Sequence, residues 1–282
     1  MPTNERDPDH LRTWIVRSAD KADEWKRALS HHVVSHGFIH YGDSLLIGSG
    51  TTLIYLSRAL VESQLAKQEA LDLAILTSNF QVQYNMRDAQ RNNAAIFGDT
   101  QVIITGGRLN HSLDSLVGGF AASAVQAPNL HPNIVFFGAS GLTFQERMHV
   151  TYHFEEEIST QVAFATRPTV NRILLCDHTK IGCKSFYDAN LSIESLMETA
   201  KNCYVITTYD PSNTVAVDTL SREQAALTEQ LSALIDRQDL IEKDFIFRMI
   251  RADGAVEREV RLDELRHRRR ANPIEKLPRV RS

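Results

Sequence analysis

The stretch Gly42-Asp43-Ser-Leu-Leu-Ile-Gly48-Ser49-Gly50-Thr51-Thr52 runs from a short apolar segment through a glycine-rich turn into a segment with helical spacing. Ser44 to Gly48 has the length and apolar content of a buried strand. Thr51 to Gln64 repeats its apolar residues every three or four positions, as an amphipathic helix does. A strand, a tight turn and a helix in this order predict an α/β fold.

The same alternation of strand and helix patterns continues along the chain. Further strands are expected at 71–76, 102–104, 133–137, 172–176 and 203–207, with helices at 79–92, 116–125, 154–165 and 193–200. Continuous apolar strands separated by helices favour a parallel sheet that is covered on both faces. We therefore expect an open, mostly parallel sheet with helices on both faces and all strand carboxyl ends on one edge.

Four segments divide the chain. We expect an irregular leader over 1–20, the main α/β domain over 21–215, an extension over 216–260 that completes the sheet, and a basic tail over 261–282. In the tail, we expect either a solvated helix end or a contact with DNA or an acidic protein, through Arg266, Arg268, Arg269 and Arg270.

Composition narrows the class of protein. The 282 residues are 43% hydrophobic and 23% charged, with a net charge of −4, so no bulk field draws the chain to nucleic acid or an anionic membrane. The polar start lacks a signal-peptide core, and no apolar run is long enough to cross a bilayer. Three scattered cysteines indicate neither a disulfide framework nor a zinc site. We expect a soluble, cytoplasmic protein without a metal or an organic cofactor.

Glycine, hydroxyl and amide residues collect in the turns that follow the expected strands. A backbone rich in glycine approaches an anion closely, and a helix start adds free N–H groups and the positive end of its dipole. An ordinary helix cap explains each turn equally well by itself. Together on one edge, the turns predict a ligand that is anionic and rich in oxygen. They are Ser49-Gly50-Thr51-Thr52, Thr77-Ser78-Asn79, Thr105-Gly106-Gly107-Arg108, Gly138-Ala139-Ser140-Gly141 and Asp177-His178-Thr179-Lys180.

In order and spacing these turns resemble the effector-sensing domain of the DeoR-type bacterial sugar repressors, from about Ala22 to Thr207. The resemblance implies a fold like ribose-phosphate isomerase, glucosamine-phosphate deaminase and the CoA transferases, in an oligomer that binds a phosphorylated sugar without catalysis. By motif match, the phosphate would lie against Ser49, Gly50, Thr51 and Thr52. The sugar would be lined by Ser78, Asn79, Gly106, Gly107, Gly138, Ser140 and Gly141, with Lys180 as the cation and Asp177 beside it.

The chain differs from these repressors in three respects, one of which is that the segment 220–282 extends beyond the usual end of their sensor. Their N-terminal winged helix-turn-helix would precede the sensor, whereas only about 20 residues precede the expected connecting helix here, so we expect no DNA-reading module. Their helix after the Gly141 turn usually carries a lysine four residues after a glutamate, whereas Gln161 follows Glu157 here.

Two other functions stay open at this stage. A sugar-phosphate isomerase needs a carboxylate base, and the nearest carboxylate in the third turn, Asp114, is better explained as a helix cap. A metal could bind His149, His153 and Glu157 if they shared one face of a helix, and His32, His36 and His40 have the same spacing. A solvated histidine face explains both sets more simply.

Overall fold

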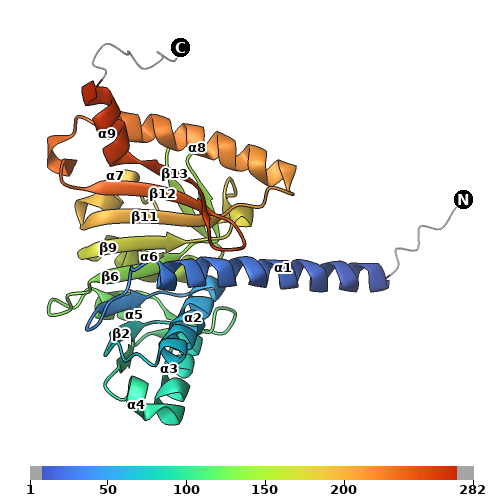
Figure 1. Ribbon diagram of the computed structural model, residues 1–282, viewed down its shortest axis with the longest axis vertical. Helices are drawn as coiled ribbons and strands as arrows, with labels where there is room; N and C mark the ends of the chain where they lie inside the picture. The colour runs from blue at the N-terminus through green and yellow to red at the C-terminus, as the bar shows by residue number, and fades with distance from the viewer. Residues whose placement is uncertain (1–7, 272–282) are drawn as a thin grey trace, which may run out of the picture.

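An eight-stranded sheet forms the centre of the protein in the computed structural model, which describes residues 8–271 (Figure 1). The strands lie in the order β13-β12-β11-β9-β6-β1-β2-β3, and every neighbouring pair is parallel except β12 with β13. The expected open, mostly parallel α/β sheet is confirmed. Its strands are β1 (Ser44–Ile47), β2 (Ala74–Thr77), β3 (Gln101–Ile104), β6 (Ile134–Gly138), β9 (Thr169–Leu175), β11 (Ala200–Thr208), β12 (Asp244–Ile250) and β13 (Val256–Arg261).

Helices cover both faces of this sheet, and the residues of β1 show how. Leu45 and Ile47 point into an apolar layer shared with α1, α2 and α3, whereas Leu46 points into the layer on the other face. Burial on both faces explains why the strands are continuously apolar. The helices are α1 (Pro8–Ser35), α2 (Thr51–Lys67), α3 (Phe80–Asn92), α4 (Ala94–Phe97), α5 (Gly119–Val125), α6 (Glu155–Thr166), α7 (Ile193–Glu198), α8 (Thr214–Leu234) and α9 (Leu262–Ala271).

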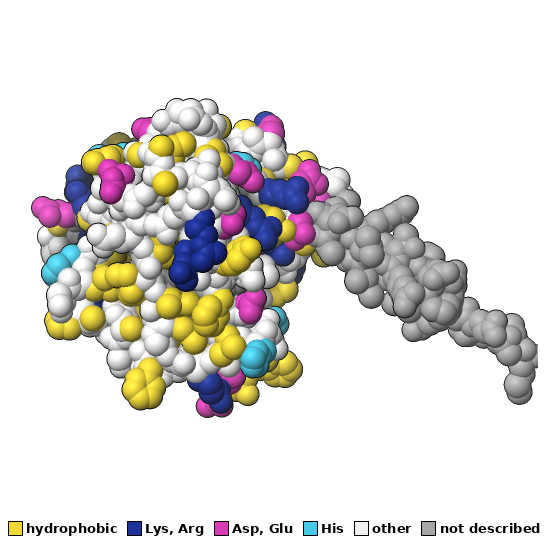
Figure 2. Space-filling model, turned by 90° about the horizontal axis from the view of Figure 1, so that it is seen from below, with side chains coloured by type: hydrophobic (Ala, Val, Ile, Leu, Met, Phe, Trp, Pro, Cys, Tyr) yellow, Lys and Arg dark blue, Asp and Glu magenta, His cyan; other side chains and the backbone are white. Residues whose placement is uncertain are grey.

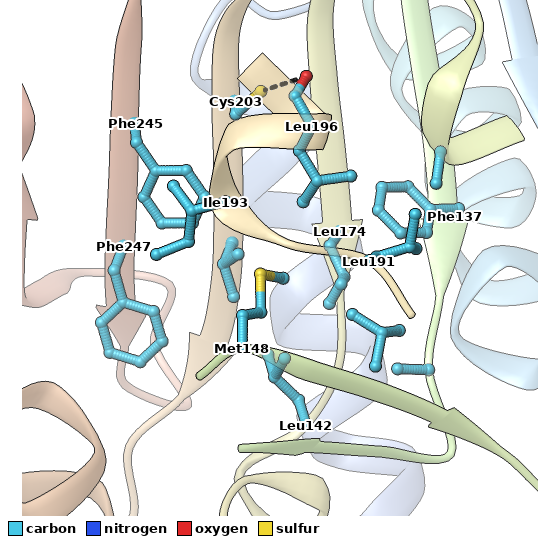
Figure 3. Close-up of a cluster of buried hydrophobic side chains, with 14 of the residues drawn as sticks. Phe137, Leu142, Met148, Leu174, Leu191, Ile193, Leu196, Cys203, Phe245 and Phe247 are labelled. Atoms are coloured by element: carbon cyan, nitrogen blue, oxygen red, sulfur yellow. Dashed lines mark hydrogen bonds between the residues drawn. The ribbon is translucent and has the colours of Figure 1, made fainter. Parts of the chain in front are cut away.

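The second layer contains most of the aromatic core. Phe137 of β6 and Phe245 and Phe247 of β12 pack there against side chains of the loop before α7 and of α7 itself (Figure 3). The Cys203 thiol lies in the same layer and donates to the carbonyl oxygen of Leu196, 3.2 Å away. Cys203 therefore serves as a small buried residue of the core.

Two small sheets and two short helical turns complete the fold. A three-stranded sheet contains β7 (Gly141–Thr143), β8 (His149–Tyr152) and β10 (Tyr187–Asp188). A hairpin contains β4 (Arg108–Asn110) and β5 (Ser115–Val117), and the 3₁₀ turns are η1 (His178–Lys180) and η2 (Gln238–Leu240).

Two predicted elements differ most from the structure. The first helix begins at Pro8 rather than near residue 21, so the expected irregular leader is helical from that residue onward. The segment 116–125 was expected to be one helix, but β5 ends at Val117 and α5 begins only at Gly119. Gly118, with φ = +91°, turns the backbone between them.

The C-terminal segment adds two strands to the sheet. β12 pairs with β11 in parallel over seven residues, and β13 returns antiparallel along β12. The helix α8 packs over η1. Its Glu223 carboxylate accepts hydrogen bonds from the Thr143 hydroxyl and from the Phe144 N–H, at the end of β7. The last part of the expected basic tail, 272–282, lies outside the described residues.

The two edges of the sheet differ in chemistry. β13 carries Glu257, Arg258 and Glu259, whereas β3 has the uncharged sequence Gln-Val-Ile-Ile and leaves Ile103 54% exposed. Figure 2 shows hydrophobic side chains gathered near the centre of the end where α4 and β3 lie. None of the helices in the described part has the length and hydropathy that crossing a bilayer requires.

Candidate functional site

The turn between β1 and α2 presents a helix start that has no side-chain cap. Gly48 donates its N–H to the carbonyl oxygen of Phe136 at 2.9 Å, which ties the turn to β6. Gly50 then adopts φ = +113°, a conformation that favours glycine, and no side chain caps this end of α2. The first N–H groups of a helix have no acceptor within the helix. Together with the helix dipole, they make this turn suited to an anion.

A cavity of about 240 Å³ opens at this helix start. Its walls come from the turns after β1, β6 and β9, from the end of β8, and from the first two turns of α6. The residues that line it are Ser49, Gly50, Thr51, Thr52, Leu53, Leu113, Gly138, Ala139, Ser140, Tyr152, His153, Glu157, Gln161 and Lys180. Among these described lining residues, Lys180 is the only lysine, and there is no arginine.

About half of the predicted site residues line this cavity. They are Ser49, Gly50, Thr51, Thr52, Gly138, Ser140 and Lys180. Asn79 lies next to the cavity and caps α3, where its Oδ1 accepts from the N–H groups of Gln81 and Val82 at 3.0 and 3.3 Å. Its Nδ2 also donates to the carbonyl oxygen of Gly50 at 3.5 Å, which links α3 to the turn between β1 and α2. Ser78 is fully buried, and its hydroxyl finds no partner among the described residues.

The other predicted residues do not line the cavity. Asp177 caps η1 by accepting the Thr179 N–H at 3.1 Å, and so holds the turn that carries Lys180. A Cβ on Gly141 would lie 2.5 Å from the carbonyl oxygen of Cys183, and one on Gly107 would lie 2.9 Å from that of Val117. Both glycines are therefore required by close packing. A Cβ on Gly106 would meet no atom within 4 Å.

Two lining residues, Glu157 and Gln161, were not assigned to the site from the sequence. Burial raises the pKa of the Glu157 carboxyl from 4.5 to about 7, although hydrogen bonds from the Phe154 N–H and the Ser49 hydroxyl and the charge of Lys180 all favour ionisation. The Gln161 side chain donates from Nε2 to the Ser49 hydroxyl oxygen. Their spacing of four residues on one helix was the available signal, because it places both on one face of α6.

Three buried oxygen atoms of this cavity lack hydrogen-bond partners among the described residues. They are Thr52 Oγ1, Glu157 Oε2 and Gln161 Oε1, on side chains that are 2–4% exposed. Buried polar atoms in folded proteins nearly always have a partner, so unpaired ones in a cavity mark where a ligand or water would bind.

The proposed histidine faces do not form. His149 lies in β8, His153 in the following loop and Glu157 in α6, so the expectation of one shared helix face was wrong. His149 Nδ1 instead lies 2.5 Å from Asp188 Oδ2. His40 lies beyond the end of α1 at Ser35. In the part of the chain that the structure describes, no group of three or more His, Cys, Asp or Glu residues is arranged to hold a metal ion.

Asp114, the carboxylate considered for an isomerase, lies outside the cavity lining. It precedes β5 and not a helix, so its expected role as the cap of a helix there was wrong. Its side chain is exposed and accepts from Gln81 Nε2 at 3.0 Å, and its carbonyl accepts from the Phe80 N–H. Asp114 therefore braces the start of α3.

A larger cavity of about 630 Å³ lies between α1 and the turn after β12. Charged residues of both signs line it, including Asp23, Arg27 and Asp253. None of its described lining residues has a buried polar atom without a partner. The smaller cavity is therefore the better candidate for a built ligand site.

Only some of the arginines of the basic tail are exposed on the surface. Arg266 is 4% exposed, and its guanidinium donates to the carbonyl oxygens of Leu240 and Lys243 at 2.7 Å. It holds α9 against the η2 turn and does not belong to a basic surface. Arg268, Arg269 and Arg270 are exposed, and Arg269 forms an ion pair with Asp236 at 3.0 Å.

A comparison with protein families gives a match over the part of the chain that contains the cavity. A family model described as the DeoR C terminal sensor domain matches residues 22–207. No curated protein matches the chain.

Among solved structures, ribose 5-phosphate isomerase A from Methanocaldococcus jannaschii matches with a TM-score of 0.37 and 11% identity, over 55% of this chain and 53% of that one. The isomerase from Neisseria gonorrhoeae matches at 0.36 and 12%, over 57% and 54%. The eIF2B beta chain from Chaetomium thermophilum matches at 0.34 and 14%, over 62% and 44%. The chain thus spans about half the length of the isomerases.

Proposed function

Because this chain belongs to the family of DeoR C-terminal sensor domains, we propose that its 240 Å³ cavity binds a phosphorylated sugar or sugar derivative as a regulatory effector. The observation that carries this proposal is the uncapped start of α2, which opens into the cavity that Lys180 also lines.

In this proposal the phosphate lies at the start of α2. Thr51 and Thr52 contribute backbone N–H groups of the first turn, and Ser49 and Thr52 add hydroxyl groups. Lys180 adds the positive charge, held in place by the Asp177 cap of η1. A helix start and a lysine together are a common arrangement for phosphate.

The size of the cavity supports a small ligand. Sites for drug-sized molecules are usually about 300–1,000 Å³, so a cavity of 240 Å³ fits a sugar phosphate better than a dinucleotide. The polar atoms without partners support a ligand rich in oxygen.

We propose that α1 transmits the effect of ligand binding to a partner. Trp25 of α1 meets the buried His178 ring edge to face, with ring centroids 5.2 Å apart, and His178 lies in the same turn as Lys180. A movement of Lys180 toward a phosphate would therefore be transmitted to α1. Transcriptional regulation in the cytoplasm, with DNA reached through a partner or through the exposed Arg268, Arg269 and Arg270, is part of this proposal.

We further propose that the chain forms a homo-oligomer through β3. A second copy of β3 could pair antiparallel with the uncharged edge about a two-fold axis and cover Ile103, whereas the charges of β13 oppose such pairing at the other edge.

An isomerase is the second candidate, and Glu157 is the observation that favours it. This buried carboxyl lies in the cavity, and a pKa of about 7 suits a general base. Product formation separates the two candidates.

The test is a thermal-shift screen of the full chain with pentose and hexose phosphates, and with the same sugars unphosphorylated. A ligand at one hundred times its Kd stabilises the folded state by about 2.7 kcal/mol. The sensor proposal predicts a shift with a phosphorylated sugar alone, a much smaller shift in Lys180→Met, and recovery of the ligand unchanged. Conversion of the ligand would favour the isomerase. Equal shifts with phosphorylated and unphosphorylated sugars would contradict the phosphate site.

A further inference from the structure

The cavity contains two buried acceptor oxygens, Glu157 Oε2 and Gln161 Oε1, that no described group satisfies. We infer that these oxygens select the ligand by accepting hydrogen bonds from hydroxyl or amino groups on its carbon chain. This inference rests on the proposed function, because it concerns the ligand of the same cavity.

Ser49 fixes which atom Gln161 presents. The Gln161 amide donates from Nε2 to the Ser49 hydroxyl oxygen. An amide carries its donor and its acceptor on different atoms, so this bond turns Oε1 away from Ser49. The other end of the amide, Oε1, is then left as an acceptor without a donor.

Gly48 leaves room for this arrangement. A Cβ at position 48 would lie 3.2 Å from Gln161 Oε1 and 3.4 Å from the carbonyl oxygen of Phe136. The glycine thus lets the amide lie close to the turn after β1 without a clash. Gln161 is 2% exposed, so its side chain cannot turn out to water.

Glu157 is held in a similar way. Against the effect of burial, the Phe154 N–H, the Ser49 hydroxyl and the Lys180 charge, which lie near its carboxyl, lower its pKa. Oε2 nevertheless has no donor, and the side chain is 4% exposed. Because buried acceptors without donors are costly, a ligand that brings donors to both oxygens gains affinity over one that does not.

The consequence is a preference between phosphates. A polyhydroxy or amino sugar phosphate places donors against Glu157 and Gln161, whereas an alkyl phosphate of similar length leaves both oxygens unpaired. The affinities are compared at pH 8, where Glu157, with a pKa of about 7, is mainly ionised. A hydrogen bond to a charged group then contributes about 1.5–3 kcal/mol, which corresponds to about 10- to 100-fold in affinity.

The experiment measures calorimetric affinities of the full chain for inorganic phosphate, n-butyl phosphate, D-glucose 6-phosphate and D-glucosamine 6-phosphate. The wild type should bind at least one sugar phosphate about tenfold or more above butyl phosphate. If D-glucosamine 6-phosphate binds more tightly than D-glucose 6-phosphate, the amino group is the hydrogen-bond donor. If the two bind equally, hydroxyl groups are the donors.

Gln161→Leu should remove the part of that preference due to Gln161, and Glu157→Gln should reduce the preference because a neutral amide replaces the charged acceptor. Affinity for inorganic and butyl phosphate should be unchanged in both, or increased in Glu157→Gln because a nearby negative charge is lost. Glu156→Gln is the matched control, because Glu156 lies on the same helix turn, pairs with Arg108 and does not line the cavity. If Gln161→Leu does not fold, Glu157→Gln carries the test, since it preserves the shape of the side chain.

Two outcomes overturn the inference and leave the phosphate site standing. In the first, the wild type binds butyl phosphate as tightly as the sugar phosphates. In the second, the variants weaken all four probes equally. If the wild type bound no phosphate at all, the proposed function would fail, and this inference with it.

Discussion

Replacing Glu157 by glutamine should change how the stability of the protein depends on pH. The carboxyl is 4% exposed, and burial raises its pKa from 4.5 to about 7 in the folded state. Folding therefore favours the protonated form. The stability contributed by this group is fully present below pH 4.5 and is lost as the pH rises through 7.

The size of the effect follows from the two pKa values. A difference of one pKa unit corresponds to about 1.4 kcal/mol, so full ionisation of Glu157 costs the folded state about 3 kcal/mol near pH 8, and under about 1 kcal/mol at pH 5. Glutamine does not ionise. The stability of Glu157→Gln relative to the wild type should thus rise by about 2.5 kcal/mol between pH 5 and pH 8.

Urea unfolding of both proteins from pH 5 to pH 9, with Glu156→Gln alongside, measures this difference directly. Glu156 lies on the same helix turn but is half-exposed, pairs with Arg108 and does not line the cavity, so Glu156→Gln serves as the matched control. A constant difference between Glu157→Gln and the wild type across this range would show that Glu157 ionises normally. It would also refute the burial on which the account of the cavity depends.

Three further predictions concern other parts of the molecule. Burial lowers the pKa of His32 from 6.5 to about 4, so the stability that its neutral form gives should be lost as the pH falls from 6.5 to 4. Between pH 6.5 and pH 4, the free energy of unfolding in urea should fall less steeply for His32→Gln than for the wild type. Equal slopes of this free energy against pH would contradict the prediction. Gly141→Ala should lower the free energy of unfolding by about 1–3 kcal/mol because its Cβ would clash with the Cys183 carbonyl, whereas Gly106→Ala should be nearly neutral. Equal losses would mean that crowding is not the cause. Ile103→Lys should reduce the sedimentation mass if copies pair through β3, and an unchanged mass would exclude that edge.

Much of the fold could be predicted because its strands are buried on both faces. Ser44 to Ile47 and Ile134 to Gly138 are continuously apolar, and each is followed by a turn rich in glycine and hydroxyl residues. The capping role of Asn79 was also visible, since its side chain precedes a helix directly. The small strands β7 and β8 were not predicted, because three and four residues are too few to show a local periodicity.

Of the residues that line the cavity, only those in the turns after strands could be predicted from the sequence. Ser49 and Lys180 follow strands, and the edge rule for parallel sheets places such residues together. Glu157 and Gln161 reach the same place from the side of a helix, and their burial depends on how α6 packs against the turn after β1. Arg266 was predicted to belong to a basic surface, but it is buried. Its guanidinium donates to the carbonyl oxygens of Leu240 and Lys243, which lie more than twenty residues earlier in the sequence.

Backbone hydrogen exchange with and without a saturating sugar phosphate tests the central claim most directly, because it locates the ligand as well as detecting it. The account predicts slowed exchange at residues 50–53, at the start of α2, and around Lys180, with little change at the larger cavity between α1 and the turn at 252–254. Protection confined to α1 and residues 252–254, with exchange at the start of α2 unchanged, would contradict it.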